Sequence, residues 1–260
     1  MLGVPEVLGV PEVLGELIGS GRTADVFALD DDWVLRRYRD GLDASHEAGV
    51  MAYLWERGFP VPRVRADGTG GTDLVLRRVS GPTLAEAAMA GALSPEEAGV
   101  LIGTLLRRLH AQPAPSPGAP PEHRVLHLDL HPENVLLTPD GPVVIDWATV
   151  EEGPPGLDIA MSALLLAEVA VAGGPASAGC RAALTALLTE TGDDRLPGPP
   201  TTAPGHLEPI GYLGHSGSGY FGHSGYLERA RARRAGNPTL GVAEVERLDA
   251  AVELVLESGR

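Results

Sequence analysis

The sequence predicts an α+β fold in two lobes, a small lobe built on an antiparallel sheet and a mainly helical lobe after it. Short strand patterns separated by turns fill the first 80 residues, and helical periodicity dominates from there to the end. A polar motif lies on a hairpin between helices. Because strands lead and helices trail, the chain is predicted to be α+β. We expect a repeat tail over residues 1–13, the first lobe over 14–80 and the second over 81–260.

The tail contains the unit "LGVPEV" twice, from Leu2 and from Leu8. Two copies are too few for a solenoid, which needs about three units to bury a core. Three strand patterns follow, "LGELI", "DVFAL" and "WVLRRY", separated by "GSGRT" and by the acidic turn Asp30–Asp32. These patterns predict an antiparallel meander.

A helix is predicted over "SHEAGVMAYLWERG", with Ser45 as its N-cap and Gly58 at its end. The segment "DLVLRRV" from Asp73 predicts the next strand, which "SGP" ends. The first lobe should therefore contain one helix beside its strands.

The second lobe opens with a predicted helix over "SPEEAGVLIGTLLRRLH". Ser94, Pro95 and Glu97 form the capping-box pattern of a helix start. A proline-rich connector leads to the motif, and "NVLLTPDGPVVIDW" predicts two strands around a Pro-Asp-Gly turn. Further helices are expected around residues 157–172, 176–190, 226–235 and 241–258.

Composition excludes several classes of protein. The most apolar run, "IAMSALLLAEVAVAGG", is interrupted by Glu168 and is interpreted as a buried helix, so no membrane span is expected. The first positive charge is Arg22, which argues against a secretory signal and for a cytoplasmic protein. The single cysteine, Cys180, excludes an internal disulfide and a cysteine-based zinc site. A net charge of −15 argues against a nucleic-acid partner and favours cationic small molecules.

The motif "HLDLHPENVLL" carries the main chemical signal. Asp129 and Asn134 are five residues apart, and Asp146 ends the apolar strand "PVVID". Phosphoryl transfer needs one carboxylate that orients and deprotonates a hydroxyl, plus an amide and a second carboxylate that hold magnesium. The spacing matches the kinase pattern H-x-D-x-x-x-x-N followed by a metal-binding aspartate. The alternative is that these side chains only cap turns and a strand end.

Two features of the first lobe point the same way. Glycines in "GSGRTADVF" let a backbone approach phosphates, although they also make ordinary hairpins. All 20 basic residues are arginines, so an arginine must stand where kinases keep a phosphate-binding lysine. Strand alternation places Arg36 and Arg37 on opposite faces; we choose Arg36 for the site, with Glu47 as its ion-pair partner. The alternative is that both arginines are solvated.

The sequence resembles the aminoglycoside phosphotransferase and choline kinase-like family, small-molecule kinases with a protein-kinase-like fold. "HLDLHPENVLL" and "VVIDW" carry the resemblance, which runs from about Leu14 to Leu166 and more faintly to the end. It implies a nucleotide-binding first lobe, a hinge near Arg77–Gly81 that meets the adenine, and an acceptor site in the second lobe. The implied roles are catalytic base for Asp129, magnesium ligands for Asn134 and Asp146, and phosphate contacts for Gly19, Ser20 and Gly21.

The sequence departs from the kinase pattern in places. The missing lysine puts nucleotide affinity in question, and the short segment between Asp146 and Asp158 leaves no room for a peptide-binding activation segment. A protein substrate is therefore not expected. Asp158 would brace the catalytic loop in the family, or cap a helix start. His110 is expected to pack or to cap its helix end.

A repeated "GHSG" places His215 and His223 eight residues apart, and we interpret this stretch as a flexible linker rather than a metal site.

The sequence thus predicts a magnesium-dependent kinase that transfers the γ-phosphoryl group of ATP or GTP to a hydroxyl of a small acceptor. A cationic acceptor such as an aminoglycoside is one candidate. The alternative is a non-catalytic, pseudokinase-like module that binds nucleotide for regulation.

Overall fold

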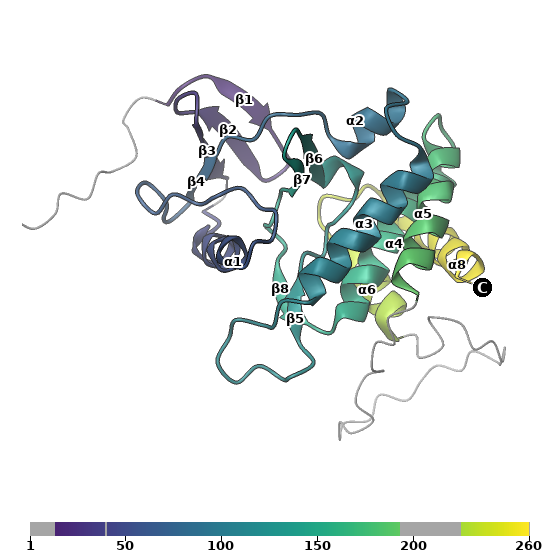
Figure 1. Ribbon diagram of the computed structural model, residues 1–260. Coiled ribbons are helices and arrows are strands. Elements are labelled where there is room, and N and C mark those ends of the chain that lie inside the picture. Colours follow the sequence, from purple (N-terminus) through teal and green to yellow (C-terminus); the bar gives the residue numbers. More distant parts are fainter. Residues whose placement is uncertain (1–13, 40, 193–224, 260) are drawn as a thin grey trace, which may run out of the picture. The chain divides into compact units, whose positions relative to one another are not determined.

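Four antiparallel strands open the first part of the chain and pair in the order β1-β2-β3-β4 (Figure 1). The computed structural model describes residues 14–39, 41–192 and 225–259. The strands are β1 Leu17–Ser20, β2 Ala24–Ala28, β3 Trp33–Tyr38 and β4 Asp73–Arg77. The predicted meander is confirmed. Its first strand lies later in the chain than predicted. Gly19 and Ser20, which were predicted to separate the first two strands, belong to β1 and pair with Val26 and Asp25.

The chain folds into two compact units. The first contains the described residues up to Leu84 together with residues 133–150, and the second contains residues 85–132 and those from 151 onward. The hairpin after the motif therefore belongs to the unit with the four-stranded sheet.

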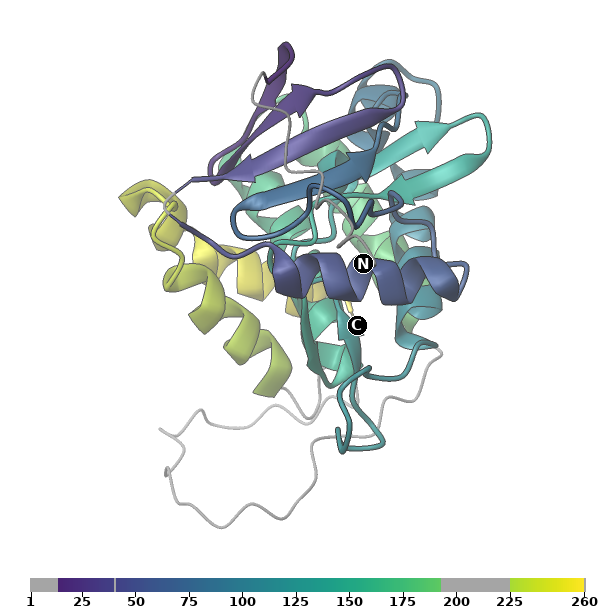
Figure 2. The same ribbon diagram turned by 90° about the vertical axis from the view of Figure 1, so that its left-hand side faces the viewer.

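Helix α1, Ser45–Glu56, lies along the sheet of the first unit (Figure 2). Its buried side chains, among them Met51 and Leu54, belong to the core of this unit. The predicted N-cap was wrong by one residue: Ala44 is the N-cap, and the Asp43 carboxylate accepts hydrogen bonds from the backbone N–H and the hydroxyl of Ser45. An acceptor two residues earlier in the chain thus replaces the expected serine cap.

The predicted hairpin is present as β6, Val135–Thr138, and β7, Gly141–Val144, followed by a fully buried Trp147. It is joined to the rest of the first unit by backbone hydrogen bonds from Leu137 to Pro82 and from Val144 to Pro60. Gly81 is required at this contact, because a Cβ there would lie 2.0 Å from the carbonyl oxygen of Leu137.

The second unit is mainly helical. Its helices are α2 Leu84–Met89, which starts at the unit boundary, α3 Pro95–His110, α4 Pro155–Ala172, α5 Ser177–Thr191, α6 Gly225–Ala235, α7 Val242–Glu246 and α8 Leu248–Ser258. The capping box at Ser94 and Glu97 is confirmed. The single helix expected over residues 241–258 was wrong, since Arg247 separates α7 from α8.

Helix α4 is the centre of the second unit, where it packs against α5, α6 and α8. It is long and apolar enough to cross a membrane, but 67% of this stretch is buried inside the protein, as expected for a core helix. Two short strands that the sequence did not indicate, β5 Arg124–Leu126 and β8 Glu151–Gly153, pair antiparallel in this unit. The two sequence repeats, "LGVPEV" and "GHSG", lie outside the described residues.

Candidate active site

The glycine-rich segment spans the end of β1, at Gly19 and Ser20, and the start of the turn to β2, at Gly21. Its backbone is closed by a hydrogen bond from Gly21 N–H to the Ala24 carbonyl, 2.9 Å. Arg39, just past β3, donates to the Gly21 carbonyl at 3.1 Å and to the Ser20 hydroxyl at 2.7 Å, and pairs with Asp25. Ser20 in turn donates to Asp25 at 2.7 Å. The Ser20 hydroxyl is thus engaged within the turn, and Arg39 fixes the turn's shape.

Replacing Arg39 with alanine should loosen this turn. Because the network is exposed, we expect a modest effect on nucleotide binding. The Kd for the non-hydrolysable analogue AMP-PNP, measured by calorimetry in the presence of Mg²⁺, should rise about two- to fivefold. Arg57→Ala, on the exposed end of α1, is the control and should leave the Kd unchanged. An unaltered Kd in Arg39→Ala would show that the turn does not contact the nucleotide.

Arg36 lies between two carboxylates of the first unit. Its Nη1 is 3.2 Å from Glu47 Oε1 on α1, and its Nη2 is 2.6 Å from Asp146 Oδ1 just after β7. Only 11% of the Arg36 side chain is exposed. The structure therefore brings together three residues that the sequence had singled out, from β3, α1 and the hairpin.

Alternation along β3 separates the two arginines. Arg37 makes a bidentate ion pair with Asp73, with both N–O distances 2.7 Å, and 39% of its side chain is exposed. Arg36 instead pairs with Glu47, as its place on the opposite face predicts. Its contact with nucleotide phosphates stays a prediction.

The positive charge of Arg36 and the negative charges of Glu47 and Asp146 influence the pKa values of Arg36 and Glu47. Burial raises the pKa of Glu47, and the charge of Arg36 and the Tyr38 hydroxyl act against that rise. Burial acts against the charge of Arg36, but the carboxylates of Asp146 and Glu47 outweigh it and raise the pKa of Arg36. Arg36 is therefore a permanent cation in this site.

The open end of the β6–β7 hairpin brings Asn134 and Asp146 together. The register pairs Val135 with Val144, and the Ile145 N–H donates to the Asn134 carbonyl at 3.0 Å. Asp146 adopts a left-handed backbone with φ of 64°, and 42% of its side chain is exposed. An amide oxygen and an accessible carboxylate are ligands that fit magnesium. No cluster of three or more His, Cys, Asp or Glu side chains suited to a metal occurs among the described residues.

Asp129 lies in the second unit, in a loop that Asp158 of α4 holds. The buried Asp158 carboxylate accepts the backbone N–H of His127 at 3.0 Å and that of Leu128 at 2.7 Å. His110, the last residue of α3, places Nε2 at 3.0 Å from Asp158 Oδ2. Of the two roles expected for Asp158, the structure shows the first, since its carboxylate holds the backbone of the loop that carries Asp129. Of the two roles expected for His110, packing is the one observed: its side chain is 8% exposed and its ring faces Asp158, while Ala111 is the C-cap of α3.

The surroundings of Asp129 favour its charged form. Burial raises its pKa, but His131, whose Nε2 lies 3.8 Å from Oδ2, and the charges of His127 and Arg234 outweigh burial, so the pKa of Asp129 is lowered. Arg234 on α6 is itself held by Glu168 on α4 through two contacts of 2.8 Å. Asp129 is thus a carboxylate at neutral pH, able to accept a hydrogen bond from a hydroxyl group.

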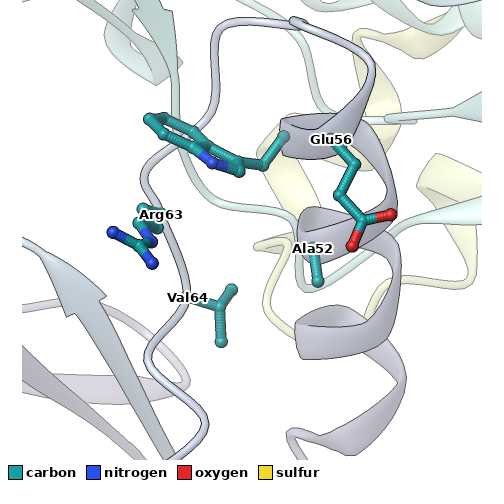
Figure 3. Close-up of a pocket in the computed structure, with 5 residues that line it drawn as sticks. Ala52, Glu56, Arg63 and Val64 are labelled. Carbon is teal, nitrogen blue, oxygen red and sulfur yellow. The ribbon is translucent and has the colours of Figure 1, made fainter.

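A separate pocket of about 340 Å³ lies beside the far end of α1 (Figure 3). Its lining includes Ala52 and Glu56 of α1, and Arg63 and Val64 from the segment that leads to β4. None of the predicted site residues lines it. Glu47 is nine residues before Glu56, about 13 Å along the helix, so this pocket is distinct from the Arg36 cluster.

Comparisons with known proteins place the geometry in context. A sequence model described as "phosphotransferase enzyme family" matches residues 15–124 and 116–199. Among curated proteins, none matches this sequence.

Two solved structures resemble the chain over almost its whole length. One is amicoumacin kinase hAmiN in complex with AMP-PNP, Ca²⁺ and Ami, with a TM-score of 0.53, 12% identity, and coverage of 96% of this chain and 89% of that one. The other is ADP-bound aminoglycoside phosphotransferase APH(2'')-Ib, with a TM-score of 0.50, 12% identity, and coverage of 94% and 93%. At this identity the likeness establishes the fold, and the predicted kinase-like fold is confirmed.

Proposed function

Because this chain belongs to the phosphotransferase enzyme family, we propose that it is a small-molecule kinase that transfers the γ-phosphoryl group of ATP or GTP to a hydroxyl group. The observation that carries the proposal is the contact of Arg36 with both Glu47 and Asp146. Phosphoryl transfer depends on a fixed cation at the phosphates and on oxygen ligands for a metal ion. The cluster supplies both kinds of group in one unit.

Each residue has a proposed role. Arg36 binds nucleotide phosphates through its planar guanidinium, and Glu47 fixes the arginine. The end of β1 and the turn after it, at Gly19, Ser20 and Gly21, cover the phosphates through the backbone rather than through the engaged Ser20 hydroxyl. Asp129 orients the acceptor hydroxyl and accepts its proton. Its lowered pKa keeps it in the ionised form, and the hydrogen bonds of Asp158 to His127 and Leu128 fix the loop that carries it.

Asn134 and Asp146 would hold magnesium in this proposal. The ion supplies positive charge that neutralises the phosphate oxygens. The Oδ1 atom of Asp146 is in contact with Arg36 in the structure, so a bound metal ion would have to share this carboxylate with the arginine.

The acceptor is proposed to be a small molecule. The net charge of −15 favours a cationic acceptor, and one of the solved structures that resemble the chain is an aminoglycoside phosphotransferase, so an aminoglycoside is the first candidate. Only eleven residues separate Asp146 from Asp158, which leaves no room for a segment that binds a peptide substrate. We also propose a cytoplasmic location and no nucleic-acid or membrane partner.

One observation favours the rival, a nucleotide-binding module without catalysis. Arginine stands in place of lysine and contacts Asp146 at 2.6 Å, which competes with metal binding at that carboxylate. Such a module would bind nucleotide but would not transfer its phosphoryl group.

A screen for nucleoside diphosphate release tests the proposal. Aminoglycosides, macrolides, amino alcohols and sugars are offered with ATP or GTP, with and without Mg²⁺. We expect release that depends on one class of acceptor and on the metal. If Mg²⁺ and nucleotide raise the unfolding temperature and none of these acceptors stimulates release, the binding module is the better description.

A further inference from the structure

Tyr38, the last residue of β3, contacts both members of the Arg36–Glu47 ion pair. Its hydroxyl donates a hydrogen bond to Glu47 Oε2, and both side chains are buried, with residue exposures of 6% and 4%. The Arg36 guanidinium carbon lies over the Tyr38 ring, 4.9 Å from its centroid. Arg36 and Tyr38 are two residues apart on one strand, so their side chains project from the same face of the sheet.

The Glu47 carboxylate is fixed through both of its oxygens. Oε1 accepts from Arg36 Nη1 and from the Trp147 backbone N–H, each at 3.2 Å. Oε2 accepts from the Tyr38 hydroxyl. Loss of that hydroxyl would remove a hydrogen bond to a buried carboxylate. Losing a hydrogen bond to a charged group costs more free energy than losing one between neutral groups. The orientation of Glu47, and through it that of Arg36, thus depends on Tyr38.

The surroundings of Arg36 suit a flat cation. One guanidinium nitrogen faces Glu47, another faces Asp146, and the planar group lies over an aromatic ring. A lysine ammonium is a compact point charge, which cannot hold two carboxylates in this forked geometry while it covers the ring. The ring and the hydroxyl of Tyr38 therefore match an arginine.

We propose that Tyr38 is a positioning residue that fixes the Arg36 guanidinium for nucleotide binding, and that the two residues act as a matched pair in place of a lysine. This inference rests on the proposed function, in which Arg36 binds phosphates. Tyr38 acts through Arg36 and Glu47 and need not touch the nucleotide itself. It follows that the usual kinase residue, lysine, would not restore or improve this site.

The test is a double-mutant cycle in the full chain with Tyr38→Phe, Arg36→Lys and the combined variant. Phenylalanine keeps the ring and removes only the hydroxyl. The readout is the Kd for AMP-PNP with Mg²⁺, measured by calorimetry well below each variant's unfolding temperature. This readout does not require the acceptor to be known.

Tyr38→Phe is expected to weaken AMP-PNP binding by about tenfold, as for the loss of a hydrogen bond to a charged group. Arg36→Lys should weaken it at least as much. In the Arg36→Lys background the further loss from Tyr38→Phe should be under about twofold, because no guanidinium remains to be positioned. Tyr53→Phe is the matched control: Tyr53 lies on α1 with the Arg57 guanidinium 3.6 Å from its ring, outside the cluster, and binding should not change.

The outcomes separate the two proposals. Equal losses from Tyr38→Phe in both backgrounds, or no loss in either, would overturn the role of Tyr38 and leave the proposed function standing. A variant Arg36→Lys that binds as well as the unaltered chain would also overturn the matched pair. Absence of AMP-PNP binding by the unaltered chain would overturn the proposed function, and the inference with it.

Discussion

Replacing Asp129 with asparagine is expected to lower kcat by roughly 10²- to 10⁴-fold, the usual effect of losing a general base. Asparagine keeps the size of the side chain but cannot accept the hydroxyl proton. The lowered pKa of Asp129 means that the carboxylate is present across the neutral range, so titration of Asp129 should not limit kcat of the unaltered chain near neutral pH. The measurement is diphosphate release under saturating nucleotide, with the acceptor that the screen identifies.

The control for this change is Asp140→Asn, which alters an exposed aspartate in the turn between β6 and β7. Its kcat should equal that of the unaltered chain. The affinity for AMP-PNP should be preserved in Asp129→Asn, because Asp129 acts on the acceptor side. A variant at Asp129 with unchanged turnover would remove this residue from the mechanism.

The second large effect is expected at Asp158. Both of its carboxylate oxygens accept hydrogen bonds, Oδ1 from the Leu128 N–H and Oδ2 from the His127 N–H, with His110 also at Oδ2. An asparagine would place its NH₂ group against one of these donors. Asp158→Asn should therefore lower the free energy of unfolding by about 3 to 5 kcal/mol, the range for breaking a buried charged pair. Urea unfolding followed by circular dichroism measures the loss.

Two comparisons show whether hydrogen bonding is the cause. Asp249→Asn, which alters a surface aspartate paired with Arg231, should cost at most about 1 kcal/mol.

Burial raises the pKa of Asp158, but the hydrogen bond and charge of His110, with help from His127, outweigh burial and lower it. Its stabilisation is then full above the unfolded aspartate pKa of about 3.9 and is lost as the pH falls through the lower folded value. The difference in the free energy of unfolding between the unaltered chain and Asp158→Asn should therefore shrink below about pH 4. A difference that is constant with pH would contradict this account.

The parts of the site that follow local rules were predictable from the sequence. Strand alternation placed Arg36 and Arg37 on opposite faces, and the structure pairs Arg36, the residue chosen for the site, with Glu47. The capping pattern at Ser94 marked the start of α3 correctly. The turn at residues 139–141 predicted a hairpin, and its register brings Asn134 and Asp146 to one end. Each of these inferences needs only the spacing of residues within one or two neighbouring elements.

The parts that depend on long-range packing were not predictable. His110 and Asp158 are 48 residues apart, and nothing in either segment alone signals their contact. The strands β5 and β8 have three residues each, too few for an alternation pattern to appear. Tyr38 was not singled out from the sequence, although strand geometry offers a signal, since an aromatic residue two positions after Arg36 shares its face.

The guanidinium of Arg36 also has a consequence for chemical labelling. Reagents that acylate amines at nucleotide sites need a side chain that can lose a proton and attack as a neutral base. A guanidinium stays protonated at any accessible pH, and the charges of Asp146 and Glu47 strengthen that preference here. With no lysine anywhere in the chain, an amine-directed probe that tags the phosphate-binding lysine of kinases would leave the Arg36 cluster unmarked.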